Sequence, residues 1–399
     1  MSSSRLSTRI VVMIGLLFAL FLTGCGSNSD DGTAPTPSDP ASLQSRIDQI
    51  RQQSSLPGMA AAVISREAID SAVSGIRKRG EPTPLARSDL FHLGSNIKAM
   101  SATLIAILVE SGSLRWDSTI AEILPELAAS MQPVYRSITI EQLLAHRSGV
   151  LSFTELADFA LLPSDLAVEL QSGSMAVIDQ RLVFVSWLLQ QPSPVIPGRD
   201  YLYSNAGYVV AAAMAERVTG ESFEQLLRQR LLLPLDLQGR FGWPATGNHQ
   251  QPWGHEEKNG VLQASDPDAP ENQFPNFANP AGNISLSIDD YARFIQAHLR
   301  GLSGQVVLIS PESYRKLHTP LGGAINNNPA QFYALGWGVI HDVNQNLSIH
   351  EGSAGTFDAL AVIEPDRNQA VIILSNAYSM AVSAAVNKTA FDLLATTPP

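Results

Sequence analysis

The chain has 399 residues, of which 45% are hydrophobic and 16% charged, and its formal net charge is −11. This composition is typical of a globular protein and excludes a largely disordered chain. An acidic chain without a basic stripe also argues against a nucleic-acid partner.

The first residues have the pattern of a bacterial export signal. Arg5 and Arg9 precede an apolar run at 10–22, which is short for a membrane span. The sequence LTGC at 22–25 resembles a lipobox, which predicts a lipoprotein signal at 1–24 and a lipid anchor on the thiol of Cys25. An uncleaved anchor and a plain secretory signal are the alternatives.

The residues after Cys25 predict how the folded domain is connected to the lipid anchor. The stretch 25–41 is rich in Ser, Asp, Gly and Pro, which is typical of a flexible tether. Cys25 is the only cysteine, so no intramolecular disulfide is expected. We expect an exported lipoprotein on the periplasmic side of the envelope. Gly26 after the cysteine favours the outer membrane.

The remaining chain predicts an α/β fold with an antiparallel sheet flanked by helices. Leu43, Ile47 and Ile50 mark a first helix, and a β-hairpin follows at 59–65 and 71–77. Further helices are expected at 99–110, 138–146, 183–190, 205–218, 222–230, 288–299, 311–317 and 380–394. Strands are expected at 333–340, 347–350, 357–363 and 370–374, and a long loop at 242–283. One domain at 42–395 results, with its α/β part at 42–115 and 284–395 and a mainly helical insertion at 116–283.

Two common hydrolase signatures are absent from the sequence. No serine lies in a G-x-S-x-G motif, which argues against an α/β-hydrolase. Neither His350-Glu351 nor His255-Glu256 is followed by the second histidine of H-E-x-x-H, which excludes a zincin.

The strongest chemical candidate is S-x-x-K at Ser95 and Lys98, at the start of a predicted helix. Residues i and i+3 share a helix face, so the Lys98 ammonium can reach the Ser95 hydroxyl. The N-terminus of a helix has unpaired N–H groups and a positive dipole end, which suit an oxyanion formed when the serine attacks a carbonyl. Alone, this motif is also explained by a serine cap and a solvated lysine.

Two further motifs strengthen the interpretation: Y-x-N at Tyr203–Asn205 and H-x-G at His350–Gly352. In this order the three motifs resemble the class C β-lactamase, DD-peptidase and esterase family of penicillin-recognising serine hydrolases. The resemblance extends over about residues 42–395 and includes LLAHRSG at 143–149, YSNAGY at 203–208, ERVTG at 216–220, PAG at 280–282 and LGWG at 335–338.

The resemblance implies roles for individual residues. Ser95 would be the nucleophile, Lys98 its cationic neighbour, and Tyr203 a proton relay whose phenolate is favoured by Lys98 and a protonated His350. Asn205 would hold the acyl amide or Lys98. The oxyanion hole would consist of the N–H groups of Ser95 and Ser353, next to Gly352. No metal ion or cofactor is required.

Other residues near these motifs have plainer interpretations. Tyr201 is expected to pack, and His146 is expected to brace its loop rather than act as a second base. The remaining histidines, at 92, 249, 255, 298, 318 and 341, are interpreted as surface or core residues.

The third motif leaves the substrate open. Class C β-lactamases have Lys-Thr-Gly where this chain has His350-Glu351-Gly352, which argues against a dedicated β-lactamase. The histidine favours a DD-carboxypeptidase-like enzyme acting on D-amino-acid peptides or peptidoglycan as a monomer. Glu351 would repel a substrate carboxylate unless its side chain turns away, which favours an esterase of the same fold. A non-catalytic penicillin-binding lipoprotein is the alternative of another class.

Overall fold

The computed structural model describes residues 42–396 except 172–173, 270–271 and 344. Cys25, the predicted signal and the predicted tether lie outside these residues. No helix of the described part is long and apolar enough to cross a membrane.

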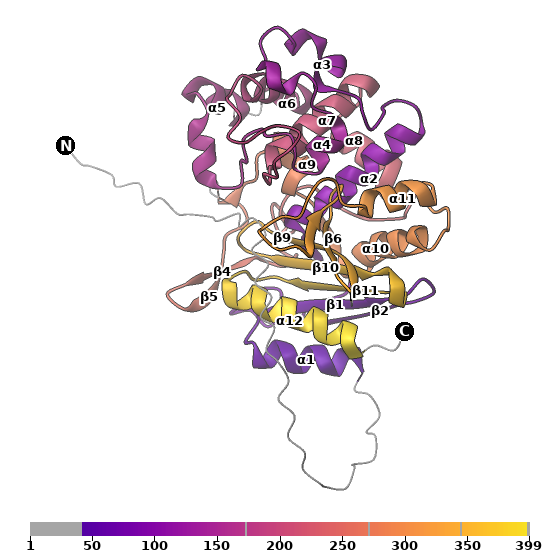
Figure 1. The fold of residues 1–399 in the computed structure, drawn as a ribbon. Helices are drawn as coiled ribbons and strands as arrows, with labels where there is room; N and C mark the ends of the chain where they lie inside the picture. The colour runs from indigo at the N-terminus through magenta and orange to yellow at the C-terminus, as the bar shows by residue number, and fades with distance from the viewer. Residues whose placement is uncertain (1–41, 172–173, 270–271, 344, 397–399) are drawn as a thin grey trace, which may run out of the picture.

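A seven-stranded sheet forms the base of the molecule, in the order β2-β1-β11-β10-β9-β8-β7 (Figure 1). Every neighbouring pair is antiparallel. The two ends of the chain meet where β1 pairs with β11, with Ala61 opposite Ile373. The predicted α/β class is therefore confirmed. The strands are β1 (Gly58–Ile64), β2 (Ile69–Gly75), β7 (Gln331–Tyr333), β8 (Gly338–His341), β9 (Asn346–Ser353), β10 (Asp358–Glu364) and β11 (Gln369–Ser375).

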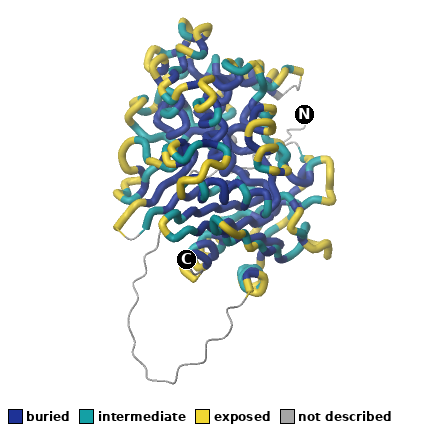
Figure 2. The backbone as a smooth tube through the Cα atoms, turned by 90° about the vertical axis from the view of Figure 1, so that its right-hand side faces the viewer, coloured by how far each residue is buried: buried dark blue, intermediate teal, exposed yellow. Residues whose placement is uncertain are grey.

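Helices cover both faces of this sheet. The terminal helices α1 (Leu43–Gln53) and α12 (Met380–Thr396) lie on one face, and α10 (Ile288–Leu302) and α11 (Pro311–His318) lie on the other (Figure 1). Strands β10 and β11 are therefore buried on both sides. Figure 2 shows much of the sheet in the dark blue of buried residues. The continuous apolar sequences of β10 and β11 follow from this position, since neither face meets water.

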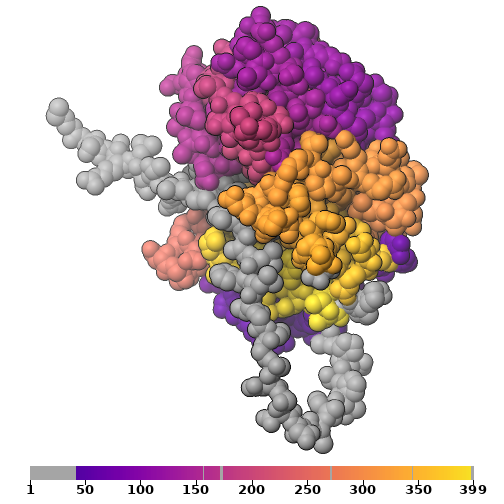
Figure 3. Space-filling view, viewed as in Figure 1, coloured from indigo at the N-terminus to yellow at the C-terminus, as the bar shows by residue number. Residues whose placement is uncertain are grey.

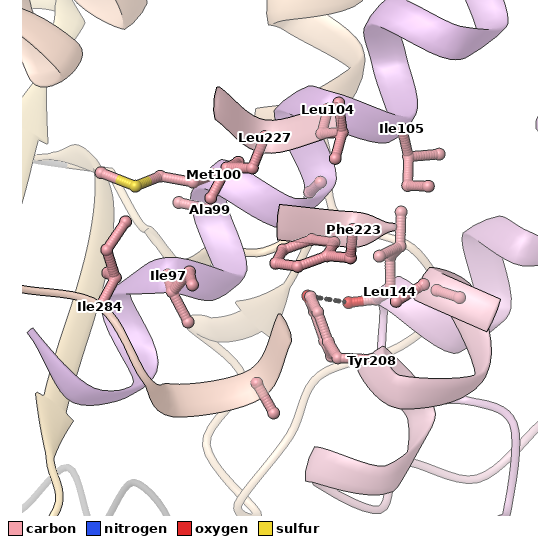
Figure 4. Close-up of a cluster of buried hydrophobic side chains, with 14 of the residues drawn as sticks. Ile97, Ala99, Met100, Leu104, Ile105, Leu144, Tyr208, Phe223, Leu227 and Ile284 are labelled. Atoms are coloured by element: carbon pink, nitrogen blue, oxygen red, sulfur yellow. Dashed lines mark hydrogen bonds between the residues drawn. The ribbon is translucent and has the colours of Figure 1, made fainter. Parts of the chain in front are cut away.

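The middle of the chain forms a separate helical body above the sheet, purple to pink in Figure 3. Helix α2 (Ile97–Glu110) lies between this body and the sheet, and its apolar side chains pack on Leu144, Phe223 and Leu227 (Figure 4). The other helices here are α3 (Ile120–Ile123), α4 (Ile140–Leu144), α5 (Ser164–Gln171), α6 (Val177–Leu188), α7 (Asn205–Thr219), α8 (Phe223–Leu227) and α9 (Asn279–Gly282).

Two predicted segments differ from the structure. The single strand expected at 333–340 is a hairpin of β7 and β8, which turns at Gly336 with a φ of +83°. A Cβ there would lie 2.7 Å from the carbonyl oxygen of Lys98, so the turn also needs glycine in order to approach α2. The long loop at 242–283 contains a second hairpin, β4 (His255–Lys258) and β5 (Val261–Ala264). Asn259 and Gly260 form its turn, and both have positive φ. Asn-Gly is a typical hairpin turn, and the prediction of a loop did not use this signal.

Candidate active site

Ser95 lies in a short turn between a strand and helix α2. Strand β3 (Leu90–His92) pairs with β6 (Ser285–Ser287), and Gly94–Asn96 form a 3₁₀ turn before the helix begins. Asn96 secures this turn because its Nδ2 donates to the carbonyl oxygen of Ala359 on β10 at 3.1 Å. Its Oδ1 accepts from the Tyr291 hydroxyl at 2.7 Å. The serine is thus held against the sheet from the β10 side.

Lys98 lies one turn further along the helix and its amine reaches the serine. The Nζ donates to Ser95 Oγ at 3.0 Å and to the carbonyl oxygen of Ala281 at 2.5 Å. The side chain is fully buried, and no ion pair joins it to a carboxylate among the described residues. Burial therefore lowers the pKa of Lys98 well below the usual 10.5. A neutral amine beside the hydroxyl can accept its proton.

Tyr203 approaches the same hydroxyl from the helical body. It precedes α7, its side chain is half-buried, and its phenol lies beside Ser95. Lys98 Nζ lies 4.9 Å from the centroid of its ring. The structure therefore brings together the three residues expected to carry the chemistry. Burial raises the pKa of Tyr203, so the expectation that its surroundings favour the phenolate is not supported.

His350 is buried on β9, on the same side of the sheet. Its Nδ1 lies 2.8 Å from the Glu351 carbonyl oxygen, which can only accept, so Nδ1 carries the proton. The other nitrogen, Nε2, accepts from the Tyr333 hydroxyl at 3.1 Å. Burial, with a smaller contribution from Lys98, lowers the pKa of His350 to about 3. The expectation of a protonated His350 is therefore not supported, because enclosure away from water favours the neutral imidazole.

Two glycines let the end of β9 lie against the serine turn. A Cβ on Gly352 would lie 2.7 Å from the Ser95 nitrogen, and one on Gly94 would lie 2.5 Å from the Ser353 nitrogen. Gly94 also has a φ of +51°, which favours glycine. The backbone at Ser353 is therefore in close contact with the backbone of the serine turn. The oxyanion hole expected from the N–H groups of Ser95 and Ser353 stays a prediction.

Asn205 begins helix α7 close to Tyr203. Its Nδ2 donates to the carbonyl oxygen of Phe153 at 2.8 Å, and its main-chain N–H donates to Ser152 at 2.8 Å. These contacts secure the loop at 152–153. The second group that holds Lys98 is the carbonyl oxygen of Ala281, which the sequence indicated only as part of the PAG motif at 280–282.

Glu351 points away from the site. Neighbouring residues of a strand face opposite sides of the sheet, so His350 faces Tyr333 while Glu351 faces α12. There its Oε1 accepts from Asn387 Nδ2 at 2.5 Å, and burial raises the pKa of the Glu351 carboxyl. Glu351 is therefore not placed to repel a substrate carboxylate. The argument for an esterase that rested on this repulsion no longer applies.

His92 supports the serine turn, although the sequence suggested only a surface or core role. Its Nδ1 accepts the N–H of Gly94 at 3.2 Å, and its Nε2 lies 3.1 Å from Asn283 Oδ1. The ring packs on Trp243 with centroids 4.2 Å apart. Burial lowers the pKa of His92 to about 4, so the imidazole is neutral and Nδ1 remains an acceptor.

A serine and a buried lysine at the start of a helix, beside a large antiparallel sheet, define a β-lactamase-like serine hydrolase. Residues 43–395 match the Beta-lactamase family, and the chain belongs to this family. Penicillin-binding protein 4 of Amycolatopsis lactamdurans is 29% identical over 353 residues, which cover 85% of this chain and 86% of that protein. Protein flp of Staphylococcus aureus strain N315 is 23% identical, and the alignment covers 84% of this chain and 63% of that protein.

Solved structures share the fold at low sequence identity. An octameric penicillin-binding protein homologue from Pyrococcus abyssi aligns with a TM-score of 0.70 and 20% identity, covering 89% of this chain and 77% of that chain. A D-stereospecific amidohydrolase from Streptomyces sp. aligns with a TM-score of 0.66 and 20% identity, covering 87% and 98%. These likenesses concern the fold alone.

Proposed function

We propose that this protein hydrolyses the amide bond of a D-amino-acid peptide through an acyl-enzyme on Ser95. The observation that carries this proposal is the 3.0 Å contact between Lys98 Nζ and Ser95 Oγ. The amine is buried and lacks a carboxylate partner among the described side chains, so the neutral form that can take up a proton is favoured.

The reaction follows from this arrangement. As Ser95 Oγ bonds to the substrate carbonyl carbon, its proton passes to Lys98 Nζ. The oxygen that becomes negative lies at the N–H groups of Ser95 and Ser353. When the C–N bond breaks, the proton passes to the leaving amine through the hydroxyl of Tyr203. A water molecule then attacks the ester, gives its proton to the same groups, and releases the acid and Ser95.

A D-amino-acid peptide is the substrate class that the observations support best. The relative from Amycolatopsis lactamdurans is named a penicillin-binding protein, and the fold is shared with a D-stereospecific amidohydrolase. Glu351 faces α12, so it does not oppose a substrate that ends in a carboxylate. We therefore propose a DD-carboxypeptidase-like activity in preference to an esterase.

We further propose that the protein is exported and anchored by a lipid on Cys25, which would keep it near peptidoglycan. The lipobox-like sequence at 22–25 supports this location. Changing Cys25→Ser should move the protein from the membrane fraction to the soluble fraction of the cell envelope. Unchanged sedimentation with membranes would instead indicate an uncleaved apolar segment.

The activity is tested on the full chain with two covalent probes and three substrates. A fluorescent penicillin and a fluorophosphonate should label the wild type and the control Ser111→Ala, whose exposed serine lies just after α2. Ser95→Ala should not be labelled. Turnover is then compared for D-Ala-D-Ala peptides, p-nitrophenyl esters and a β-lactam, and the peptides should be the best substrates. Faster ester turnover would favour the esterase, and labelling without turnover of any substrate would favour a penicillin-binding protein without hydrolase activity.

A further inference from the structure

His146 occupies an unusual position directly behind Tyr203. It follows helix α4, is fully buried, and has a φ of +57°, a left-handed conformation that few non-glycine residues adopt. Such a conformation has a cost and persists only where surrounding contacts over-determine it. The contacts of His146 therefore show which part of the structure depends on it.

These contacts converge on the segment that carries Tyr203. The main-chain N–H of Leu202 donates to the carbonyl oxygen of His146 at 2.9 Å. The main-chain N–H of Ser204 donates to His146 Nδ1 at 3.0 Å. Between these two anchors the imidazole packs on the Tyr203 ring itself, with centroids 4.1 Å apart and planes 40° apart. One residue thus holds Tyr203 by both neighbouring amides and by its ring.

The hydrogen bonds also determine what His146 cannot do. Nδ1 accepts an amide N–H, so in the neutral ring the proton lies on Nε2. Burial is the main cause that lowers the pKa of His146 well below its usual value. The lone pair that a base would need is used by Ser204, and this excludes the role of second base left open by the sequence.

Tyr333 packs on the same side of the Tyr203 ring as His146. Its ring lies 4.6 Å from the His146 ring and 6.2 Å from the Tyr203 ring, centroid to centroid. Its hydroxyl is held by His350 Nε2. On this side the Tyr203 ring therefore packs against two aromatic rings whose own positions are set by hydrogen bonds.

We propose that His146 is a positioning residue that holds the Tyr203 hydroxyl against Ser95 during acyl transfer. This inference rests on the proposed function, because it assigns His146 an effect only through Tyr203. A phenol displaced by about 1 Å would lose the alignment that proton transfer needs, while substrate binding would change little.

The test compares His146→Phe, which keeps a ring but loses the acceptor, with His146→Asn, which tolerates left-handed backbone and keeps a side-chain oxygen. His255→Asn is the matched control, since His255 is also buried and its nitrogens contact the main chain of Arg79 and Asn376. We expect His146→Phe to lower kcat about 30-fold with KM within about twofold, and His146→Asn to recover part of the loss. The control should lower the melting temperature without this loss of kcat.

A double-mutant cycle separates positioning from general damage. In a chain that already carries Tyr203→Phe, the change His146→Phe should lower kcat by less than about twofold, because residues that act through one group are not additive. A full 30-fold loss in that background, or wild-type kcat for His146→Phe alone, would overturn the inference. If His146→Phe does not fold, His146→Asn in both backgrounds decides by the same comparison. A wild type without turnover would refute the proposed function instead.

Discussion

Two fully buried basic side chains, Lys98 in the candidate site and Arg181 in the helical body, are held in opposite ways. Arg181 on α6 forms ion pairs with Glu216 and Glu224, and its Nε donates to the carbonyl oxygen of Phe277 at 3.0 Å. Lys98 contacts only a hydroxyl and a carbonyl oxygen among the described residues that hydrogen-bond to it. Both side chains are wholly removed from solvent.

The difference distinguishes a charged side chain that stabilises the fold from a neutral amine that can take part in the reaction. A buried charge is retained when it is paired, and otherwise the group loses its charge. Burial raises the pKa of the Glu216 carboxyl to about 7 even beside an arginine, which indicates how strongly this interior disfavours charge. Lys98 meets the same penalty without a carboxylate, so we infer that its amine is kept neutral next to Ser95 and is available as a base.

Replacing Lys98 should give the largest effect on activity. Lys98→Met keeps the length of the side chain and removes the base, so kcat should fall about 1,000-fold. Unfolded Lys98 binds a proton up to about pH 10.5, while the folded amine has a lowered pKa, so the wild type gains stability as the pH rises toward 10.5. The difference in unfolding free energy between Lys98→Met and the wild type should therefore move in favour of the wild type between pH 7 and pH 10. Urea unfolding at both pH values measures this, and an unchanged difference would indicate that Lys98 is charged in the folded protein.

Replacing Arg181 should affect stability far more than chemistry. Arg181→Met leaves two carboxylates without their cation, which typically costs about 3–5 kcal/mol. Glu216→Gln in the same chain should recover part of the loss. The control is Arg217→Met, whose exposed pair with Glu126 should contribute less than about 1 kcal/mol. Urea unfolding measures the three variants. Equal losses of unfolding free energy for Arg181→Met and Arg217→Met would contradict the structural role given to the charge of Arg181.

Acid should weaken the serine turn through His92. This group has a pKa of about 4 in the folded protein and about 6.5 when unfolded, so the unfolded chain binds more protons between these values. Stability is therefore lost as the pH falls from 6.5 to 4, by about 3 kcal/mol for this group. His92→Asn should flatten that part of the pH profile of unfolding free energy. A variant with the same slope as the wild type would show that other groups carry it.

Asp358 provides the smallest test, as a buried acid without a cation. Asp358 on β10 lies on the same face of the sheet as Glu351 on β9. Its Oδ2 has no hydrogen-bond partner among the described residues. Burial, reinforced by Glu351, raises the pKa of Asp358 well above its usual value, so stability present at low pH is lost as the pH rises through that pKa. Asp358→Asn should stabilise the protein at pH 8 by about 1 kcal/mol and little at pH 5. Stabilisation that is equal at both pH values would contradict this.

Local patterns predicted much of this molecule, and long-range contacts explain what they missed. The apolar runs of β10 and β11 and the i, i+3 spacing of Ser95 and Lys98 are local, so they could be read from the sequence. The contacts of His92 with Asn283 and of Lys98 with Ala281 span more than 180 residues, and no local pattern encodes them. The neutral state of His350 depends on enclosure, which appears only once the chain has folded.

The central claim, that a neutral Lys98 activates Ser95, is tested most directly by the pH dependence of acylation. The rate constant for labelling by a neutral fluorophosphonate is measured from pH 5 to pH 10.5, with circular dichroism to confirm that the protein stays folded. If Lys98 is neutral, the rate should reach its plateau well below the usual lysine pKa of 10.5 and stay level above it, and Lys98→Met should be slow throughout. A rate that climbs about tenfold per pH unit up to pH 10 would show a lysine of ordinary pKa and contradict the account.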